Sequence, residues 1–264
     1  MRILITNDDG MNAPGLVALE SAAERLGADV YVVAPEREQS AKSHAITIRH
    51  PVFAHRLPLT HGETLRVAVS GTPCDCVRLA MIKLLKSPPD LVLSGINHGG
   101  NLGWNVFHSG TVSAAAEAHA FGIPAIAFSL ANWTSKVEWG GLDQLAERMI
   151  KRLTGATHSR KDWLYNVNFP PLPSEQIKGV RLTRQNPMVK GDNFLEREAP
   201  DGRSYYWPIW DEVNAAREQQ NDPELDTVAI REGYISVTPM RYEVSNLNEP
   251  GVEQVFEDFE AGQE

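Results

Sequence analysis

Asp8 and Asp9 are the first residues of the chain that could carry out chemistry, because they stand side by side in the turn that ends an apolar run at residues 3–5. Two neighbouring carboxylates repel each other, and the repulsion grows where burial weakens screening by water. A divalent cation such as Mg²⁺ or Mn²⁺ would offset it, since hard cations prefer oxygen ligands. The alternative for this loop alone is that one aspartate caps the next helix and the other is solvated.

Two later loops, at residues 36–47 and 94–111, offer further polar groups. The first is serine-rich, which by itself is a weak signal. The second is glycine-rich, and its end, Ser109-Gly110-Thr111, stands directly before an alanine-rich stretch typical of a helix. A helix N-terminus exposes backbone N–H groups that bind phosphate, although Ser109 alone is also a good N-cap. The other polar candidates in the two loops are Ser40, Ser43, His44, Asn97, Asn101 and His108.

The elements that must position these residues alternate between strands and helices. Pro14 suits the first turn of a helix, apolar residues then recur at helical spacing, and Gly27 supplies the end. Apolar runs on either side of this helix, at residues 3–5 and 29–35, make it part of a β-α-β unit. The same alternation continues through residues 1–175 and predicts an α/β core, with an open, largely parallel sheet covered by helices on both faces.

Residues 176–250 differ from this core, because the segments GVRLTRQ, SYYWPIW and TVAIREGYISVTP are all strand-like. We expect a β-rich extension of the same domain, with Gly233 at a bulge or hairpin turn. The extension is aromatic in its middle, and such surface is usually covered by core or by another subunit. Its apolar residues there are Tyr205, Tyr206, Trp207, Ile209 and Trp210. We expect the acidic end of the chain, residues 253–264, to be frayed.

The three polar loops should meet at one edge of the sheet, because each follows a strand and ligands of open α/β sheets bind at the carboxyl ends of strands. A cation site and a phosphate site would then lie side by side. That arrangement suits metal-assisted hydrolysis of a phosphate ester.

Six segments together resemble the SurE family of 5′-nucleotidases. In chain order they are ILITNDDG, VVAPEREQS, SGTPCDCV, LVLSGINHGGNLG, HSGTVSAAAEA and DTVAIREGYISVTPM. The resemblance implies a Rossmann-like core, an arm exchanged between subunits of a homodimer or homotetramer, and one divalent ion per subunit, Mg²⁺ or Mn²⁺. It also implies hydrolysis of nucleoside 5′-monophosphates, and it leaves open whether 3′-monophosphates and short polyphosphate are cleaved.

The family motifs also imply roles for particular residues. The implied metal ligands are Asp8, Asp9, Ser40 and Asn97, and the two aspartates are the implied catalytic residues. The implied substrate-binding residues are Asn101, Ser109, Gly110 and Thr111. The serine loop departs from the family, which often has glycine at the position of Ala41, so Ser43 is the rival of Ser40 as a ligand.

Composition excludes several other classes. The chain has 34 acidic and 25 basic residues, and this balance disfavours a nucleic-acid-binding surface. Cys74 and Cys76 are too close in sequence for an ordinary disulfide, and two thiols cannot complete a zinc site without further ligands, so we expect packing residues. No segment is apolar and long enough for a leader or a membrane span, and we expect a cytoplasmic protein without membrane contact.

Three other functions are alternatives to the phosphatase. A receiver-like signalling domain needs an aspartate at the end of its central strand, where this chain reads Ser-Gly-Ile-Asn at residues 94–97. A haloacid-dehalogenase-type phosphatase needs Asp-x-Asp, where this chain reads Asp-Asp-Gly. A non-catalytic regulatory protein that binds metal and nucleotide stays open. Within the phosphatase hypothesis, His108 is a candidate general acid because it adjoins the phosphate loop.

Overall fold

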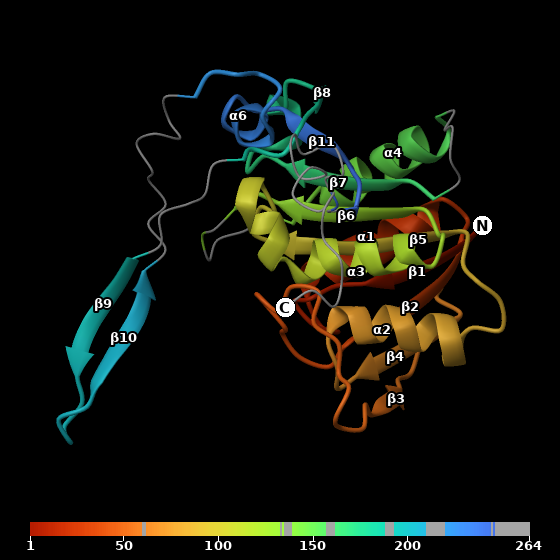
Figure 1. Cartoon of the computed structure of the whole chain (residues 1–264). Helices are drawn as coiled ribbons and strands as arrows, with labels where there is room; N and C mark the ends of the chain where they lie inside the picture. The colour runs from red at the N-terminus through yellow and green to blue at the C-terminus, as the bar shows by residue number, and fades with distance from the viewer. Residues whose placement is uncertain are drawn as a thin grey trace, which may run out of the picture.

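The computed structural model describes residues 1–59, 62–132, 134, 139–156, 162–187, 193–209, 220–243 and 245 of the 264-residue chain. Its centre is a nine-stranded sheet with the order β3-β4-β2-β1-β5-β6-β7-β11-β8 (Figure 1). The strands of this sheet are β1 (Arg2–Thr6), β2 (Asp29–Pro35), β3 (Ala54–Arg56), β4 (Leu65–Val69), β5 (Leu91–His98), β6 (Ala125–Leu130), β7 (Leu164–Phe169), β8 (Val180–Leu182) and β11 (Ile235–Met240).

The middle of the sheet is parallel. Strands β4, β2, β1, β5, β6 and β7 all run the same way, whereas β3 is antiparallel to β4 and β11 is antiparallel to β7. In β1, the residues from Ile3 to Thr6 are buried, as expected for a strand covered on both faces. Because β1 lies between β2 and β5, the loops that follow these three strands emerge together.

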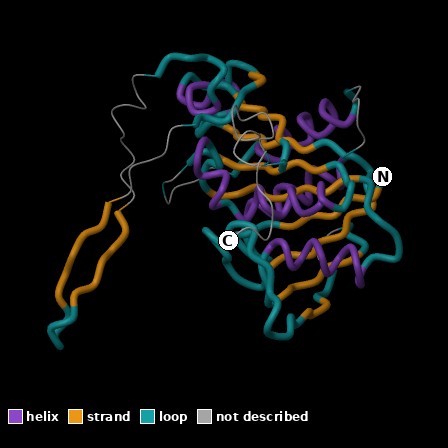
Figure 2. The backbone as a smooth tube through the Cα atoms, viewed as in Figure 1, coloured by secondary structure: helices purple, strands orange, loops and turns teal. Residues whose placement is uncertain are grey.

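Two pairs of helices cover the two faces of the sheet (Figure 2). Helices α1 (Pro14–Arg25) and α4 (Leu142–Thr154) pack together on one face, and α2 (Pro73–Leu79) and α3 (Gly110–Ala120) pack together on the other. Helix α1 begins at Pro14 and ends just before Gly27, whose φ of +67° favours glycine. The predicted α/β class, with helices on both faces of a largely parallel sheet, is confirmed.

One of the strand-like segments contains a helix. The run DTVAIR forms α6 (Asp226–Arg231), and only the following residues form strand β11. Val228 and Ala229 are fully buried, so tertiary packing outweighs the β propensity of this run. Gly233, with a φ of +85°, follows the end of α6. The prediction of a bulge or hairpin turn at this glycine is therefore wrong.

A separate hairpin, β9 (Asn193–Glu198) with β10 (Ser204–Ile209), stands away from the sheet (Figure 1). Both of its strands are exposed along their whole length, including Tyr206 and Trp207. Trp210 and the acidic end at residues 253–264 lie outside the described residues. Within the part of the chain that the structure describes, no helix is long and apolar enough to cross a membrane.

Candidate active site

Asp8 lies beneath the N-terminus of α3. Its side chain is buried, and the hydroxyl of Thr111 donates a short hydrogen bond to its Oδ1. A Cβ atom on Gly110 would lie 2.9 Å from the Asp8 Cβ, closer than side chains normally approach. Glycine at position 110 therefore allows the N-terminus of α3 to contact the Asp8 carboxylate. This contact joins two loops that are about 100 residues apart in sequence.

Asp9 connects the first loop to the end of β5. The backbone N–H of His98 donates a hydrogen bond to Asp9 Oδ2 at 3.0 Å. The preceding residue, Asn97, is buried, and its Nδ2 donates to the carbonyl of Gly99 at 2.7 Å. This hydrogen bond uses the amide nitrogen of Asn97 and leaves its Oδ1 able to act as an acceptor or metal ligand.

The serine loop (residues 36–47) reaches the same place. The N–H of Gln39 donates to the main-chain oxygen of Asp8 at 2.7 Å, which puts Ser40 next to the first loop. The Ser40 hydroxyl donates to Glu38 Oε1 at 2.6 Å. The rival serine, Ser43, is already used as an anchor, because its hydroxyl donates to the carbonyl of Phe107 at 2.6 Å. Each hydroxyl donates one hydrogen bond and keeps lone pairs for a cation, so Ser40 stays the ligand implied by the family motif, with Ser43 as its rival.

The backbone of the serine loop is unusual. Ala41 and Ser43 have φ values of +57° and +53°, in the left-handed region that side chains other than glycine adopt rarely. The amide of Ser43 also donates to the carbonyl of His108 at 3.1 Å, so this residue is tied twice to the turn before α3. The position where the family often has glycine thus requires a glycine-like backbone here, although alanine occupies it.

Ser109 is the N-cap of α3, because its Oγ accepts a hydrogen bond from the N–H of Val112 at 3.0 Å. The capping alternative is therefore correct for this residue, but capping does not exclude a role in binding. The cap is buried and lies one residue before Gly110, at the end of the helix that faces Asp8. His108 is exposed, and the structure places only its carbonyl in a contact with the serine loop.

Burial perturbs both carboxylates. Desolvation raises the pKa of Asp8 to about 7, with a further increase from the charge of Asp9, while the hydrogen bond from Thr111 acts in the opposite direction. Desolvation also raises the pKa of Asp9, against the hydrogen bond from the His98 backbone. Without a cation, the pair therefore holds a proton near neutral pH, and a bound divalent ion would restore both negative charges.

Asn101 is held in place rather than exposed to solvent. Its backbone N–H donates to Asn168 Oδ1 at 2.9 Å, its carbonyl accepts from Asn166 and Asn168, and its Nδ2 donates to Ser129 at 2.8 Å. Sequence reasoning missed Asn166 and Asn168. The signal was present, because these two asparagines alternate along β7 and would otherwise be unexplained polar residues in a buried strand.

Asp226, at the start of α6, is a second residue that sequence reasoning missed. It is fully buried, and it accepts hydrogen bonds from the N–H of Gly103 at 2.7 Å and of Asn186 at 3.1 Å. Gly103 begins the 3₁₀ turn η2 (Gly103–His108) that leads into Ser109. The C-terminal part of the chain therefore supports the loop that carries the predicted substrate-binding residues.

The fold is that of an α/β protein with a largely parallel sheet, a class in which ligands generally bind at the carboxyl ends of the strands. The family model described as Survival protein SurE matches residues 3–191. Proteins named 5′-nucleotidase SurE match along 94% of the chain, at 43% identity in Carboxydothermus hydrogenoformans and 44% in Paramagnetospirillum magneticum, and 93% of each relative is covered. The crystal structure of the SurE protein from Aquifex aeolicus is similar with a TM-score of 0.80 at 33% identity, covering 97% of this chain and 98% of that one.

The chain belongs to the SurE family. The resemblance seen in the sequence motifs is therefore confirmed, and so is the fold that it implied.

Proposed function

We propose that this protein is a divalent-metal-dependent phosphatase that hydrolyses nucleoside 5′-monophosphates to nucleoside and phosphate. The observation that carries the proposal is the carboxylate pair of Asp8, buried directly under the N-terminus of α3, and its neighbour Asp9, which is bound to the end of β5. The name 5′-nucleotidase, which relatives carry over nearly the whole length of the chain, supports this activity.

The residues at the site fit one Mg²⁺ or Mn²⁺ ion. The donors we assign are the carboxylates of Asp8 and Asp9, the hydroxyl of Ser40 and the amide oxygen of Asn97, which are all hard oxygen atoms. The raised pKa of Asp8 supports this assignment, because it marks a charge that the protein alone does not compensate. When bound, such an ion would polarise the phosphoryl group and lower the pKa of a water ligand.

The remaining residues position the substrate. We assign the phosphate to Ser109, Gly110 and Thr111, because the backbone N–H groups and the dipole of a helix N-terminus stabilise negative charge that develops on phosphoryl oxygens. Thr111 also orients Asp8 through its hydroxyl. We also assign Asn101 to the substrate-binding residues. Its hydrogen bonds to β6 and β7 hold it in place and make the loop that follows β5 rigid.

Release of phosphate from AMP, with Mn²⁺ or with a chelator, tests the proposal. We expect release with Mn²⁺ or Mg²⁺ and none with the chelator. If no metal supports release while the protein still binds AMP, the alternative of a non-catalytic nucleotide-binding regulatory protein replaces the enzyme. A panel that includes 3′-monophosphates and short polyphosphate then defines the range of substrates.

We further propose that the protein is a homodimer or homotetramer, with residues 176–250 as an extension that carries an oligomerisation arm. The exposed hairpin supports this, because Tyr206 and Trp207 present apolar surface that a second subunit could cover. Light scattering of an active monomer at micromolar concentration would refute it. We also propose a cytoplasmic location, since the free, buried Cys74 and Cys76 suit a reducing compartment.

A further inference from the structure

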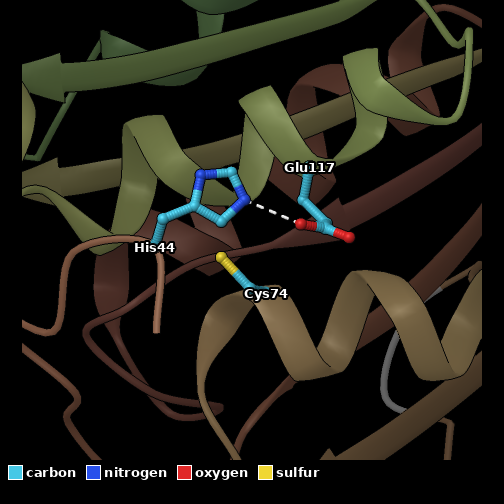
Figure 3. A group of neighbouring side chains, drawn as sticks. All are labelled: His44, Cys74 and Glu117. Carbon is cyan, nitrogen blue, oxygen red and sulfur yellow. Dashed lines mark hydrogen bonds and ion pairs between the residues drawn. The ribbon is translucent and has the colours of Figure 1, made fainter. Parts of the chain in front are cut away.

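Three side chains from distant parts of the sequence meet between α2 and α3 (Figure 3). His44 comes from the serine loop, Cys74 from the first turn of α2 and Glu117 from the middle of α3. One nitrogen, one sulfur and one oxygen atom of these residues lie within 4.8 Å of one another. In Figure 3 all three side chains point toward a common centre.

Two residues of the cluster, Cys74 and Glu117, are buried, and the third, His44, is partly exposed to solvent. Cys74 is fully buried and Glu117 is 7% exposed, whereas the side chain of His44 is 27% exposed and gives solvent a route to the other two. Burial and the neighbouring carboxylates raise the pKa of the Cys74 thiol to about 12, so the thiol keeps its proton until an ion displaces it. A thiol, an imidazole and a carboxylate are the three side-chain types that zinc binds.

Other residues hold the ligand atoms in place from outside. Arg78 donates to Glu117 Oε1 at 2.8 Å, which leaves Oε2 to face Nε2 of His44 at 2.7 Å. On the far side of the imidazole, Nδ1 lies 2.9 Å from the hydroxyl of Tyr242. Metal-binding histidines typically donate their second N–H to such a partner, and a tyrosine hydroxyl can accept it.

We propose that His44, Cys74 and Glu117 form a second metal site that binds Zn²⁺ or a similar borderline ion, with a water as the fourth ligand. Tetrahedral zinc with ordinary bond lengths separates its protein ligand atoms by roughly 3.4–3.6 Å. The imidazole and the carboxylate must therefore open by less than 1 Å from 2.7 Å, and the separations that involve sulfur, which are at most 4.8 Å, must close by up to about 1.2 Å. The thiol loses its proton to solvent, and a neutral imidazole keeps its single proton on Nδ1 while Nε2 binds the ion, so binding releases one proton per ion.

This site differs in chemistry from the one at Asp8 and Asp9. The aspartate site offers oxygen atoms alone and suits Mg²⁺ or Mn²⁺, whereas the cluster contains a thiolate that softer ions favour. The cysteine therefore also provides the means to distinguish the two sites, because only a metal bound to sulfur gives thiolate-to-metal charge-transfer absorption.

Titration of the full chain with Co²⁺, in the presence of excess Mg²⁺, tests the second site. We expect charge-transfer absorption in the near ultraviolet that Zn²⁺ abolishes, together with release of one proton per ion measured by calorimetry in two buffers. Cys74→Ala should remove the band and weaken Co²⁺ binding at the cluster by at least about tenfold. Cys76→Ala is the matched control, because Cys76 is equally buried on α2 but two residues away and on another face.

Asp9→Asn and His44→Ala complete the test. Asp9→Asn should leave the band unchanged, because it alters only the oxygen site, and His44→Ala should weaken the band without altering the buried core. Circular dichroism checks that each variant is folded. A wild-type protein without the band, or a folded Cys74→Ala variant that keeps it, overturns the proposal. None of these readings depends on phosphatase activity, so failure of the proposed enzyme would be recognised separately.

Discussion

The substitution Gly110→Ala tests whether the contact between α3 and Asp8 matters for function. A Cβ at position 110 would lie 2.9 Å, 3.0 Å and 3.3 Å from three atoms of Asp8, whereas ordinary contacts begin at 3.4 Å. The carboxylate or the helix must therefore move by about 0.5 Å. Because a displacement of about 1 Å at a catalytic site can reduce the rate about 100-fold, we expect kcat/KM for AMP to fall by roughly tenfold.

The stability of the Gly110→Ala variant should change much less than its activity. Overpacking costs about 1–3 kcal/mol, but alanine is favoured over glycine in a helix by up to about 1 kcal/mol, and the two effects oppose each other. Phosphate release across a Mn²⁺ titration gives the activity, and urea unfolding gives the stability. Gly140→Ala is the control, because no atom of the residues that the structure describes lies within 4 Å of its added Cβ. Wild-type activity and Mn²⁺ dependence in Gly110→Ala would refute the placement of Asp8 in the catalytic site.

Three further predictions concern charge. Asp9→Asn removes one ligand charge, so Mn²⁺ affinity should fall by at least about tenfold, with activity partly recovered at high Mn²⁺; an unchanged titration curve would contradict the metal assignment. With a chelator present, the pKa of Asp8 is about 7 in the folded state and 3.8 in the unfolded state, so the folded protein binds more protons between these pH values. The unfolding free energy should therefore fall by about 1.4 kcal/mol for each pH unit as the pH rises from 3.8 to about 7. Urea unfolding should show this slope in wild type and lose most of it in Asp8→Asn. Arg66→Ala removes the guanidinium that binds the fully buried Glu20 at 2.8 Å and should lower the unfolding free energy by about 3–5 kcal/mol, whereas the exposed Arg203→Ala should change it little.

Local signals in the sequence predicted much of the core. Pro14, the helical spacing of Leu16 and Leu19, and Gly27 are sufficient to define α1, because each acts within a few residues of its own position. The rule that ligands gather at the carboxyl ends of parallel strands then brought Asp8 and Asn97 to one edge without any knowledge of side-chain contacts. The helix α6 was missed because Thr, Val and Ile favour strands, and only burial against the sheet reverses that preference.

The long-range contacts of the site could not be predicted from local patterns. Glu117 lies 73 residues from its partner His44, and Asp226 lies 123 residues from Gly103, so neither pair leaves a periodic signal. The motif resemblance favoured Ser40 over Ser43 as a ligand, and that stays a prediction. The contact of the Ser43 hydroxyl with the carbonyl of Phe107 left no signal in the sequence, because it follows only from the way the serine loop packs on η2.

The left-handed residues of the serine loop have a consequence for how often the metal site is complete. Ala41 and Ser43 each cost about 1–2 kcal/mol in this conformation, while the two hydrogen bonds of Ser43 together contribute a net 1–3 kcal/mol. Because these amounts nearly cancel, the loop stays attached through its other contacts, such as the hydrogen bond from Gln39 to Asp8 and the contact of His44 with Glu117. If Ser40 binds the proposed ion, the apparent dissociation constant would be the intrinsic value divided by the fraction of molecules with the loop attached, so the backbone at position 41 would influence the metal concentration at which the protein responds.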